Sequence, residues 1–113
     1  MPELSHLFIH VEDLARSRRF YADQLGLAVL LDEGDYLRLG GGDGFHMGLE
    51  QRPLDQVGAA GIEIVIKVRD VEADYARLSA QGIVFDTAPA DMPWGARHAW
   101  LKDPDGYRLS IYS

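Results

Sequence analysis

Two stretches of the chain share one pattern of hydrophobic and polar positions. FIHVEDL at residues 8–14 returns as VIKVRDV at residues 65–71, so that Asp13 corresponds to Asp70. Apolar runs rich in β-branched residues predict β-strands, and an aspartate directly after such a run is a preferred N-cap of a helix. Each stretch is therefore predicted to be a strand that leads into a helix.

Apolar residues with helical spacing follow each aspartate and end at a glycine, Gly26 in the first half and Gly82 in the second. Glycine in this place is the usual C′ cap of a helix. Short apolar or alternating runs come after both helices, at residues 28–31, 35–40, 45–50, 83–85, 97–102 and 107–113. Each half of the chain is thus predicted to be a βαβββ module.

The predicted organisation is a single α+β domain built from two tandem modules. Module one spans residues 1–52, a linker spans residues 52–60, and module two spans residues 61–113. A length of 113 residues, 47% of them hydrophobic, suits one compact domain. Neither module can bury its sheet face alone, so we expect the two modules to pair.

Composition excludes several classes of function. The formal net charge is −7, with the acids scattered along the chain, and such a surface repels nucleic acid and anionic membranes. The absence of cysteine excludes disulfides and thiolate chemistry. We find neither a signal peptide nor an apolar run long enough to span a membrane, so a cytoplasmic protein is expected.

Strand alternation divides the side chains into two faces. One face of each strand is purely apolar and is expected to meet the helix. The other, which we call the mixed face, carries polar and aromatic residues: His6, Phe8, His10, His46, Glu50, Glu63, Arg108, Ser110 and Tyr112. A mixed face either lines a space enclosed by the sheet or simply meets water.

The chain resembles the vicinal oxygen chelate superfamily, which includes glyoxalase I, extradiol dioxygenases and bleomycin-resistance proteins. The resemblance covers nearly the whole chain and is carried by VEDL, RRFYADQLG and the ending WG…DPDGYRLSI. It implies two βαβββ modules that form a curled mixed sheet around a cavity lined by the mixed face. It also implies a homodimer that exchanges modules, in which His6 of one chain would face Glu63 of its partner.

The resemblance implies metal-ligand positions as well. The first-strand positions are His6 and Glu63, which suit zinc, nickel, manganese or iron, and the last-strand positions are Gly48 and Ser110. Glycine has no side chain to offer, and a serine hydroxyl is a poor substitute for the family's glutamate. His46 and Glu50 lie two residues, about 6.6 Å, from Gly48 along the strand, whereas a metal bond is about 2 Å long.

Aromatic residues suggest what a cavity would hold. Trp94, Arg97 and Trp100 come from a stretch where module two is longer than module one. Aromatic walls suit a planar or polycyclic small molecule, although Trp100 in the core and Trp94 over a sheet edge is the simpler alternative. His98 is interpreted as an ordinary strand residue. The expected ligand-binding set is Phe8, Tyr36, His46, Glu50, Trp94, Arg97, Trp100, Ser110 and Tyr112.

Three functions follow from these patterns. The first is a small-molecule binder, with no cofactor or a weakly held divalent metal, which resembles bleomycin-resistance proteins and sequesters an aromatic or amphipathic ligand. The second is a divalent-metal-dependent enzyme that resembles a glyoxalase or an extradiol dioxygenase. His6 and Glu63 would be its metal ligands, and His46 or Glu50 would be a further ligand or the general base. The third is an accessory domain with a vestigial pocket. The sequence leaves open the charge of the ligand and the presence of turnover.

Overall fold

The computed structural model describes residues 5–41, 44–54 and 62–113, and it divides the chain into two compact units. Unit 1 is Met1–Asp55 and unit 2 is Gln56–Ser113. The predicted linker, residues 52–60, falls for its greater part outside the described residues.

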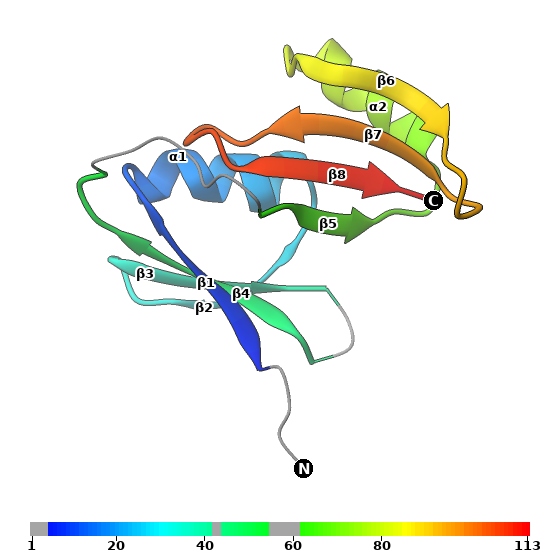
Figure 1. Cartoon of the computed structure of the whole chain (residues 1–113). Coiled ribbons are helices and arrows are strands. Elements are labelled where there is room, and N and C mark those ends of the chain that lie inside the picture. Colours follow the sequence, from blue (N-terminus) through cyan, green and yellow to red (C-terminus); the bar gives the residue numbers. More distant parts are fainter. Residues whose placement is uncertain (1–4, 42–43, 55–61) are drawn as a thin grey trace. The chain divides into compact units, whose positions relative to one another are not determined.

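Unit 1 has a four-stranded sheet in the order β1-β4-β3-β2 (Figure 1). Strand β1 runs parallel to β4, and the other neighbours are antiparallel. The elements along the chain are β1 (His6–Val11), α1 (Leu14–Arg18), the π-helical η1 (Arg19–Gln24), β2 (Ala28–Asp32), β3 (Tyr36–Gly40) and β4 (His46–Gln51).

Unit 2 repeats this topology with the order β5-β8-β7-β6, again with one parallel pair, β5 and β8. Its elements are β5 (Ile64–Lys67), α2 (Val71–Ala80), β6 (Phe85–Asp91), β7 (Arg97–Lys102) and β8 (Arg108–Tyr112). The prediction of two βαβββ modules is therefore confirmed. No helix among the described parts of the chain is long and apolar enough to cross a membrane.

Both helices begin at the predicted aspartates. Asp13 accepts a hydrogen bond from the Arg16 amide at 3.1 Å, and Asp70 accepts one from the Ala73 amide at 3.2 Å. Such a cap stabilises a helix by about 1 kcal/mol. Each helix therefore starts within a few residues of the end of the strand before it, β1 or β5.

The two helices end differently. After α2, the amides of Gly82 and Ile83 donate to the carbonyls of Ser79 and Leu78, the Schellman pattern, with Gly82 at a φ of 89°. In unit 1 the α-helix continues as the π-helical η1, and after it the Leu25 amide donates to the Phe20 carbonyl at 2.9 Å.

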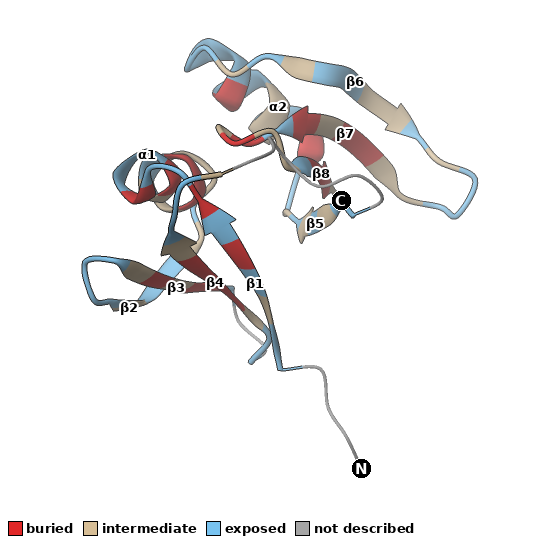
Figure 2. Ribbon diagram, turned by 60° about the vertical axis from the view of Figure 1, so that its left-hand side comes forward, coloured by how far each residue is buried: buried red, intermediate tan, exposed pale blue. Residues whose placement is uncertain are grey.

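The core of each unit forms where its helix covers the apolar face of its sheet. Figure 2 shows buried residues along α1 and along β1, β3 and β4 in unit 1. The buried apolar residues of unit 1 include Val11, Leu14, Tyr21, Leu37, Leu39 and Leu49, and those of unit 2 include Val71, Leu78, Leu101, Leu109 and Ile111. Burial of one such side chain contributes about 1.5–3 kcal/mol, and it fixes which face of each strand is left for function.

Two details differ from the prediction. Strand β6 continues to Asp91, beyond the predicted run at residues 83–85, because it is an edge strand in which Pro89 and two register shifts are tolerated. Strand alternation would place Ile62 on the apolar face with Ile64 and Ile66, but Ile62 precedes β5 and is 54% exposed.

The turn between β7 and β8 is closed by Asp103. Its carboxylate accepts hydrogen bonds from the amides of Asp105 at 2.9 Å and Tyr107 at 2.8 Å. Burial, together with the negative charges of Asp103 and Asp105, raises the pKa of the Tyr107 hydroxyl above its ordinary value of 10.0. This turn aligns β8 with β7 and thereby sets the register of the mixed face in unit 2.

Candidate functional site

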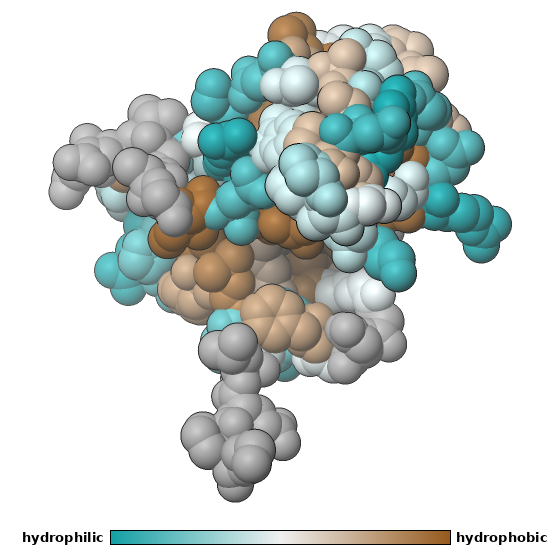
Figure 3. All heavy atoms as spheres, turned by 45° about the vertical axis from the view of Figure 1, so that its right-hand side comes forward, coloured by the Kyte–Doolittle hydropathy of each residue, from teal (hydrophilic) through white to brown (hydrophobic). Residues whose placement is uncertain are grey.

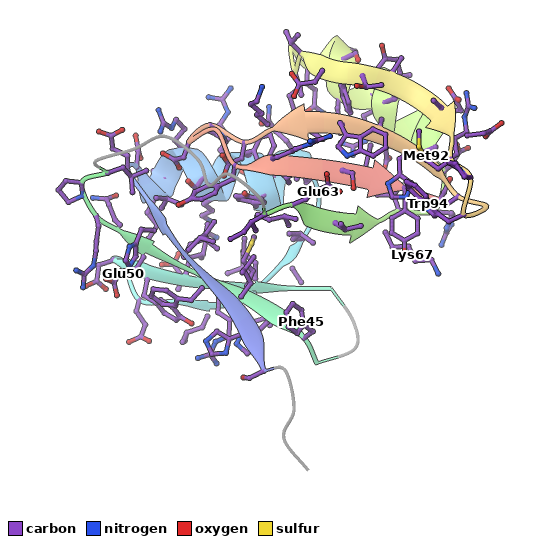
Figure 4. All side chains as sticks on the ribbon, in the orientation of Figure 1. Phe45, Glu50, Glu63, Lys67, Met92 and Trp94 are labelled. Atoms are coloured by element: carbon purple, nitrogen blue, oxygen red, sulfur yellow. The ribbon has the colours of Figure 1, made fainter. Side chains whose placement is uncertain are left out.

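The mixed face of unit 2 is assembled by strand register. Because β5 pairs with β8 and β8 with β7, side chains of three strands fall into two rows across the face. One row is Val65, Ser110 and Trp100, and the other is Lys67, Tyr112 and His98. Glu63 comes directly before β5 and Trp94 lies in the turn between β6 and β7 (Figure 4).

A chain of hydrogen bonds connects four of these side chains, and we call it the polar chain: Trp94, His98, Ser110 and Glu63. Trp94 Nε1 lies 3.1 Å from His98 Nε2, and His98 Nδ1 lies 3.3 Å from Ser110 Oγ. Ser110 Oγ in turn lies 3.2 Å from Glu63 Oε2. The polar chain therefore runs from an exposed indole through buried groups to a partly exposed carboxylate.

Donor chemistry gives the polar chain one direction. The Trp94 indole N–H can only donate, so His98 Nε2 must accept and the ring hydrogen must sit on Nδ1. His98 then donates from Nδ1 to Ser110, and the Ser110 hydroxyl donates to the Glu63 carboxylate, which can only accept when ionised. These partners thus assign the ring hydrogen of His98 to Nδ1.

Glu63 receives two further donors at its other oxygen. Trp100 Nε1 donates to Glu63 Oε1 at 2.7 Å, and Arg108 Nε lies 3.3 Å from the same atom. Because the side chains of Arg108 and Glu63 are 58% and 31% exposed, the ion pair adds little net stability. Its effect is geometric, since it holds the carboxylate against the sheet.

Aromatic rings surround His98. Its ring is stacked with Trp100 at 5.2 Å and with Tyr112 at 4.9 Å between centroids, and Trp94 meets it edge-on at 5.3 Å. Arg108 also lies 5.8 Å from the Trp100 ring centroid. Most of this face is therefore made of aromatic rings, with a few polar groups held in place by hydrogen bonds. Small-molecule sites have the same make-up. Trp100 belongs to this face and not to the core.

The mixed face of unit 1 carries rings in place of a polar chain. His6 and His46, which are register partners on β1 and β4, stack with centroids 4.7 Å apart and an interplanar angle of 7°. Phe8 stacks with Tyr36 at 6.2 Å. Glu50 at the other end of β4 (Figure 4) forms an ion pair with Arg52.

Gly48 lets these rings approach the sheet. A Cβ at this position would lie 2.9 Å from Tyr36 Oη and 3.2 Å from Phe8 Cδ2. The Phe8 and Tyr36 rings thus occupy the space that a glutamate at position 48 would need. We call Phe8, Tyr36 and Gly48 the aromatic shelf.

Several large apolar side chains stay exposed, including Phe8 at 44%, Phe45 at 50% and Trp94 at 64%. Figure 3 shows apolar residues on the surface among hydrophilic ones. Isolated exposed apolar residues are common, but aromatic ones on a functional face provide contact area for a ligand.

Arg97 is not brought together with the other predicted site residues. It alternates with His98 and Trp100 on β7, and its guanidinium pairs with Glu72 of α2 and with Asp91 at the end of β6. The hydrogen bond to Glu72, followed by that to Asp91, raises the pKa of Arg97 above its ordinary value. Arg97 therefore ties β7 to α2 and β6.

Within each unit, side chains at or beside the positions that the resemblance gives for metal ligands are engaged in other contacts. Among the residues that the structure describes, no three His, Asp or Glu side chains gather in a group that could hold one. His6 and His46 stack face to face with centroids 4.7 Å apart, so their ring nitrogens do not converge on one point. In unit 2, Glu63 already accepts from Trp100, Ser110 and Arg108.

The sequence analysis did not predict the hydrogen bonds that His98 makes with Trp94 and Ser110. The alternation in RHAWLK places His98 on the same face as Trp100 and Lys102, which was the available signal. Its contact with Ser110 depends on the register between β7 and β8, which the sequence pattern did not provide.

A family model for the Glyoxalase/Bleomycin resistance protein/Dioxygenase superfamily matches residues 3–111. The chain belongs to this superfamily. The resemblance seen in its sequence motifs is thereby confirmed, and so is the fold that the resemblance implies. Among curated proteins, none matches the chain significantly.

Solved structures share the fold. A superfamily member from Sphaerobacter thermophilus DSM 20745 is 25% identical, with 99% of this chain and 97% of that one covered and a TM-score of 0.77. A glyoxalase/bleomycin resistance protein from Streptomyces sp. CB03234 is 26% identical, with coverages of 97% and 100% and a TM-score of 0.76. TnmS3, an antibiotic binding protein from the same Streptomyces strain, is 23% identical, with coverages of 98% and 94% and a TM-score of 0.81.

Proposed function

We propose that this protein is a metal-independent small-molecule binder that sequesters a planar aromatic ligand on the mixed face of unit 2. One observation carries the proposal: the Glu63 carboxylate, at a metal-ligand position of the superfamily, is held by Trp100, Ser110 and Arg108 beside a stack of aromatic rings. A carboxylate held in this way positions the partly exposed Trp100 indole, which is stacked on His98, within the face that would contact a ligand.

The physical basis of binding would be aromatic area held by a rigid support. Trp100 and Tyr112 flank His98, and hydrogen bonds restrict the Trp100 and His98 rings before a ligand arrives. Less side-chain freedom is then lost on binding, which increases affinity for a given contact area. A sequestering protein needs no more chemistry than this.

The wider family supports the proposal without deciding it. The superfamily's name joins enzymes with resistance proteins, and one structure with this fold is described as an antibiotic binding protein. Fold alone does not fix function, and the side chains of the unit 2 face are what favour a binder. The homodimer predicted from the sequence stays a prediction, which sedimentation equilibrium can test.

The first experiment uses intrinsic fluorescence. Trp94 and Trp100 are the two tryptophans of the chain, and both belong to this face, so the emission reports on it directly. We expect planar compounds of two to four fused rings to quench it saturably. The Trp100→Ala variant should weaken binding by about tenfold or more, since one base-sized aromatic contact contributes about 1–3 kcal/mol.

The control addresses the metal. We expect nickel, cobalt, manganese, iron(II) and zinc to bind no tighter than about millimolar, and we expect His6→Ala to leave aromatic-ligand affinity within about tenfold, or 1.4 kcal/mol. Tight stoichiometric metal binding that His6→Ala or Glu63→Ala abolishes would overturn the proposal and favour a metal-dependent enzyme.

A further inference from the structure

The hydrogen bond between Trp94 and His98 joins an exposed side chain to a buried one. Trp94 is 64% exposed, whereas His98 is 6% exposed. The turn that carries Trp94 is held by its own backbone, because the Met92 amide donates to the Ala96 carbonyl at 2.8 Å and the Gly95 amide to the Met92 carbonyl at 3.0 Å. The indole can therefore leave His98 by rotation of its side chain while the turn stays in place.

If the indole moved away, His98 Nε2 would be left as a hydrogen-bond acceptor without its donor. The ring hydrogen of His98 stays on Nδ1 because that nitrogen donates to Ser110, whose hydroxyl donates to Glu63. Stacking with Trp100 and Tyr112 restrains the ring itself. Nε2 would thus keep its lone pair in place, and a buried acceptor without a donor is unfavourable.

We infer that Trp94 is a displaceable internal ligand of His98 Nε2, and that the molecule bound by this face is a neutral aromatic compound with an N–H or O–H group at its ring edge. Phenols and indole-type heterocycles are of this class. The inference rests on the proposed function and names its ligand class. The bound molecule would approach His98 edge-on, as the Trp94 indole does with an interplanar angle of 78°.

Charges on the same face favour this class over a cation. Arg108 lies beside Glu63 and Trp100, and Lys67 is the register partner of Tyr112. Both would repel a cationic ligand, and the Glu63 carboxylate is already paired. An aromatic ring without an N–H or O–H group at its edge could stack on this face but could not donate a hydrogen bond to His98 Nε2.

A matched pair of probes tests the inference by isothermal titration calorimetry. 2-Naphthol carries an O–H at the ring edge, and 2-methoxynaphthalene has the same ring without a donor. We expect the natural protein to bind 2-naphthol about 2- to 10-fold more tightly, the range that one net hydrogen bond provides.

Variants assign the preference to named atoms. Trp94→Phe keeps a ring but removes the competing N–H, so affinity for 2-naphthol should rise by about 2- to 10-fold while affinity for 2-methoxynaphthalene stays within about twofold. His98→Phe should abolish the preference between the two probes. A preference unchanged by both variants would overturn the inference.

The outcomes separate the two proposals. Equal binding of both probes by the natural protein and by Trp94→Phe would overturn the inference and leave the proposed function standing. Failure of both probes to bind would overturn both. A measurement without ligand adds an independent test: ¹⁵N chemical shifts of the His98 ring should show the hydrogen on Nδ1, and a hydrogen on Nε2 would contradict the inference.

Discussion

The two units share one topology, and their mixed faces differ at the centre. Gly48 on β4 and Ser110 on β8 hold corresponding places, each beside a parallel first strand. The bare backbone at Gly48 lets the Phe8 and Tyr36 rings lie against the sheet. The Ser110 hydroxyl instead links His98 to Glu63. At the centre of the face, rings therefore lie directly against the backbone in unit 1, whereas a hydroxyl connects two side chains in unit 2.

The largest effect is expected when the family's glutamate is placed on the aromatic shelf. Gly48→Glu would push a Cβ against Tyr36 Oη and Phe8, which lie 2.9 Å and 3.2 Å away. Overpacking of this kind costs about 1–3 kcal/mol, so we expect a clearly lower midpoint in urea unfolding followed by circular dichroism.

The control for this variant is Gly41→Ala, because a Cβ there would meet only Leu27 Cδ2 at an ordinary 3.7 Å. Its midpoint should stay near that of the natural protein. If Gly48→Glu were as stable as the natural protein and also bound zinc tightly, the distinction between the two faces would fail. The rings of the aromatic shelf would then have moved to make room for a metal site.

A somewhat smaller effect is expected when the polar chain is cut at its middle. Ser110→Ala leaves His98 Nδ1 and one Glu63 oxygen without their partner, which costs about 1–3 kcal/mol for buried groups and less for the partly exposed carboxylate. Tryptophan fluorescence during urea unfolding measures this loss of stability, because both tryptophans lie in unit 2.

Ser79→Ala is the matched control, since Ser79 is exposed on α2. We expect it to change the free energy of unfolding by less than about 0.5 kcal/mol. An unchanged midpoint for Ser110→Ala would mean that the hydrogen bonds of the polar chain add no stability that unit 1 lacks.

The smallest expected effect is a change of stability with pH that comes from Tyr107 in unit 2. Because burial raises the pKa of Tyr107 above 10.0 in the folded chain, its contribution to stability is full below the unfolded pKa, about 10, and is lost as pH rises through the folded pKa. We expect fluorescence-monitored stability to fall above pH 10, and we expect Tyr107→Phe to flatten that decline. The same slope in both proteins would exclude Tyr107 as its source.

The sequence determined the repeated part of this protein. Asp13 and Asp70 fixed the helix starts, the glycines after each helix fixed their ends, and alternation assigned each strand residue to a face, because these features depend on neighbours along the chain. The six predicted mixed-face positions on β1 and β8 are His6, Phe8, His10, Arg108, Ser110 and Tyr112, and they alternate with the apolar residues of those strands.

Tertiary structure decided which of these side chains meet. The partners of Glu63 are Trp100, Ser110 and Arg108, and His98 reaches Ser110 across 12 positions of sequence. Such contacts depend on cross-strand register, and a shift of one residue would send every side chain of a strand to the other face. Periodicity identifies faces but not register, so only the folded sheet could join His98 to Glu63 through a serine.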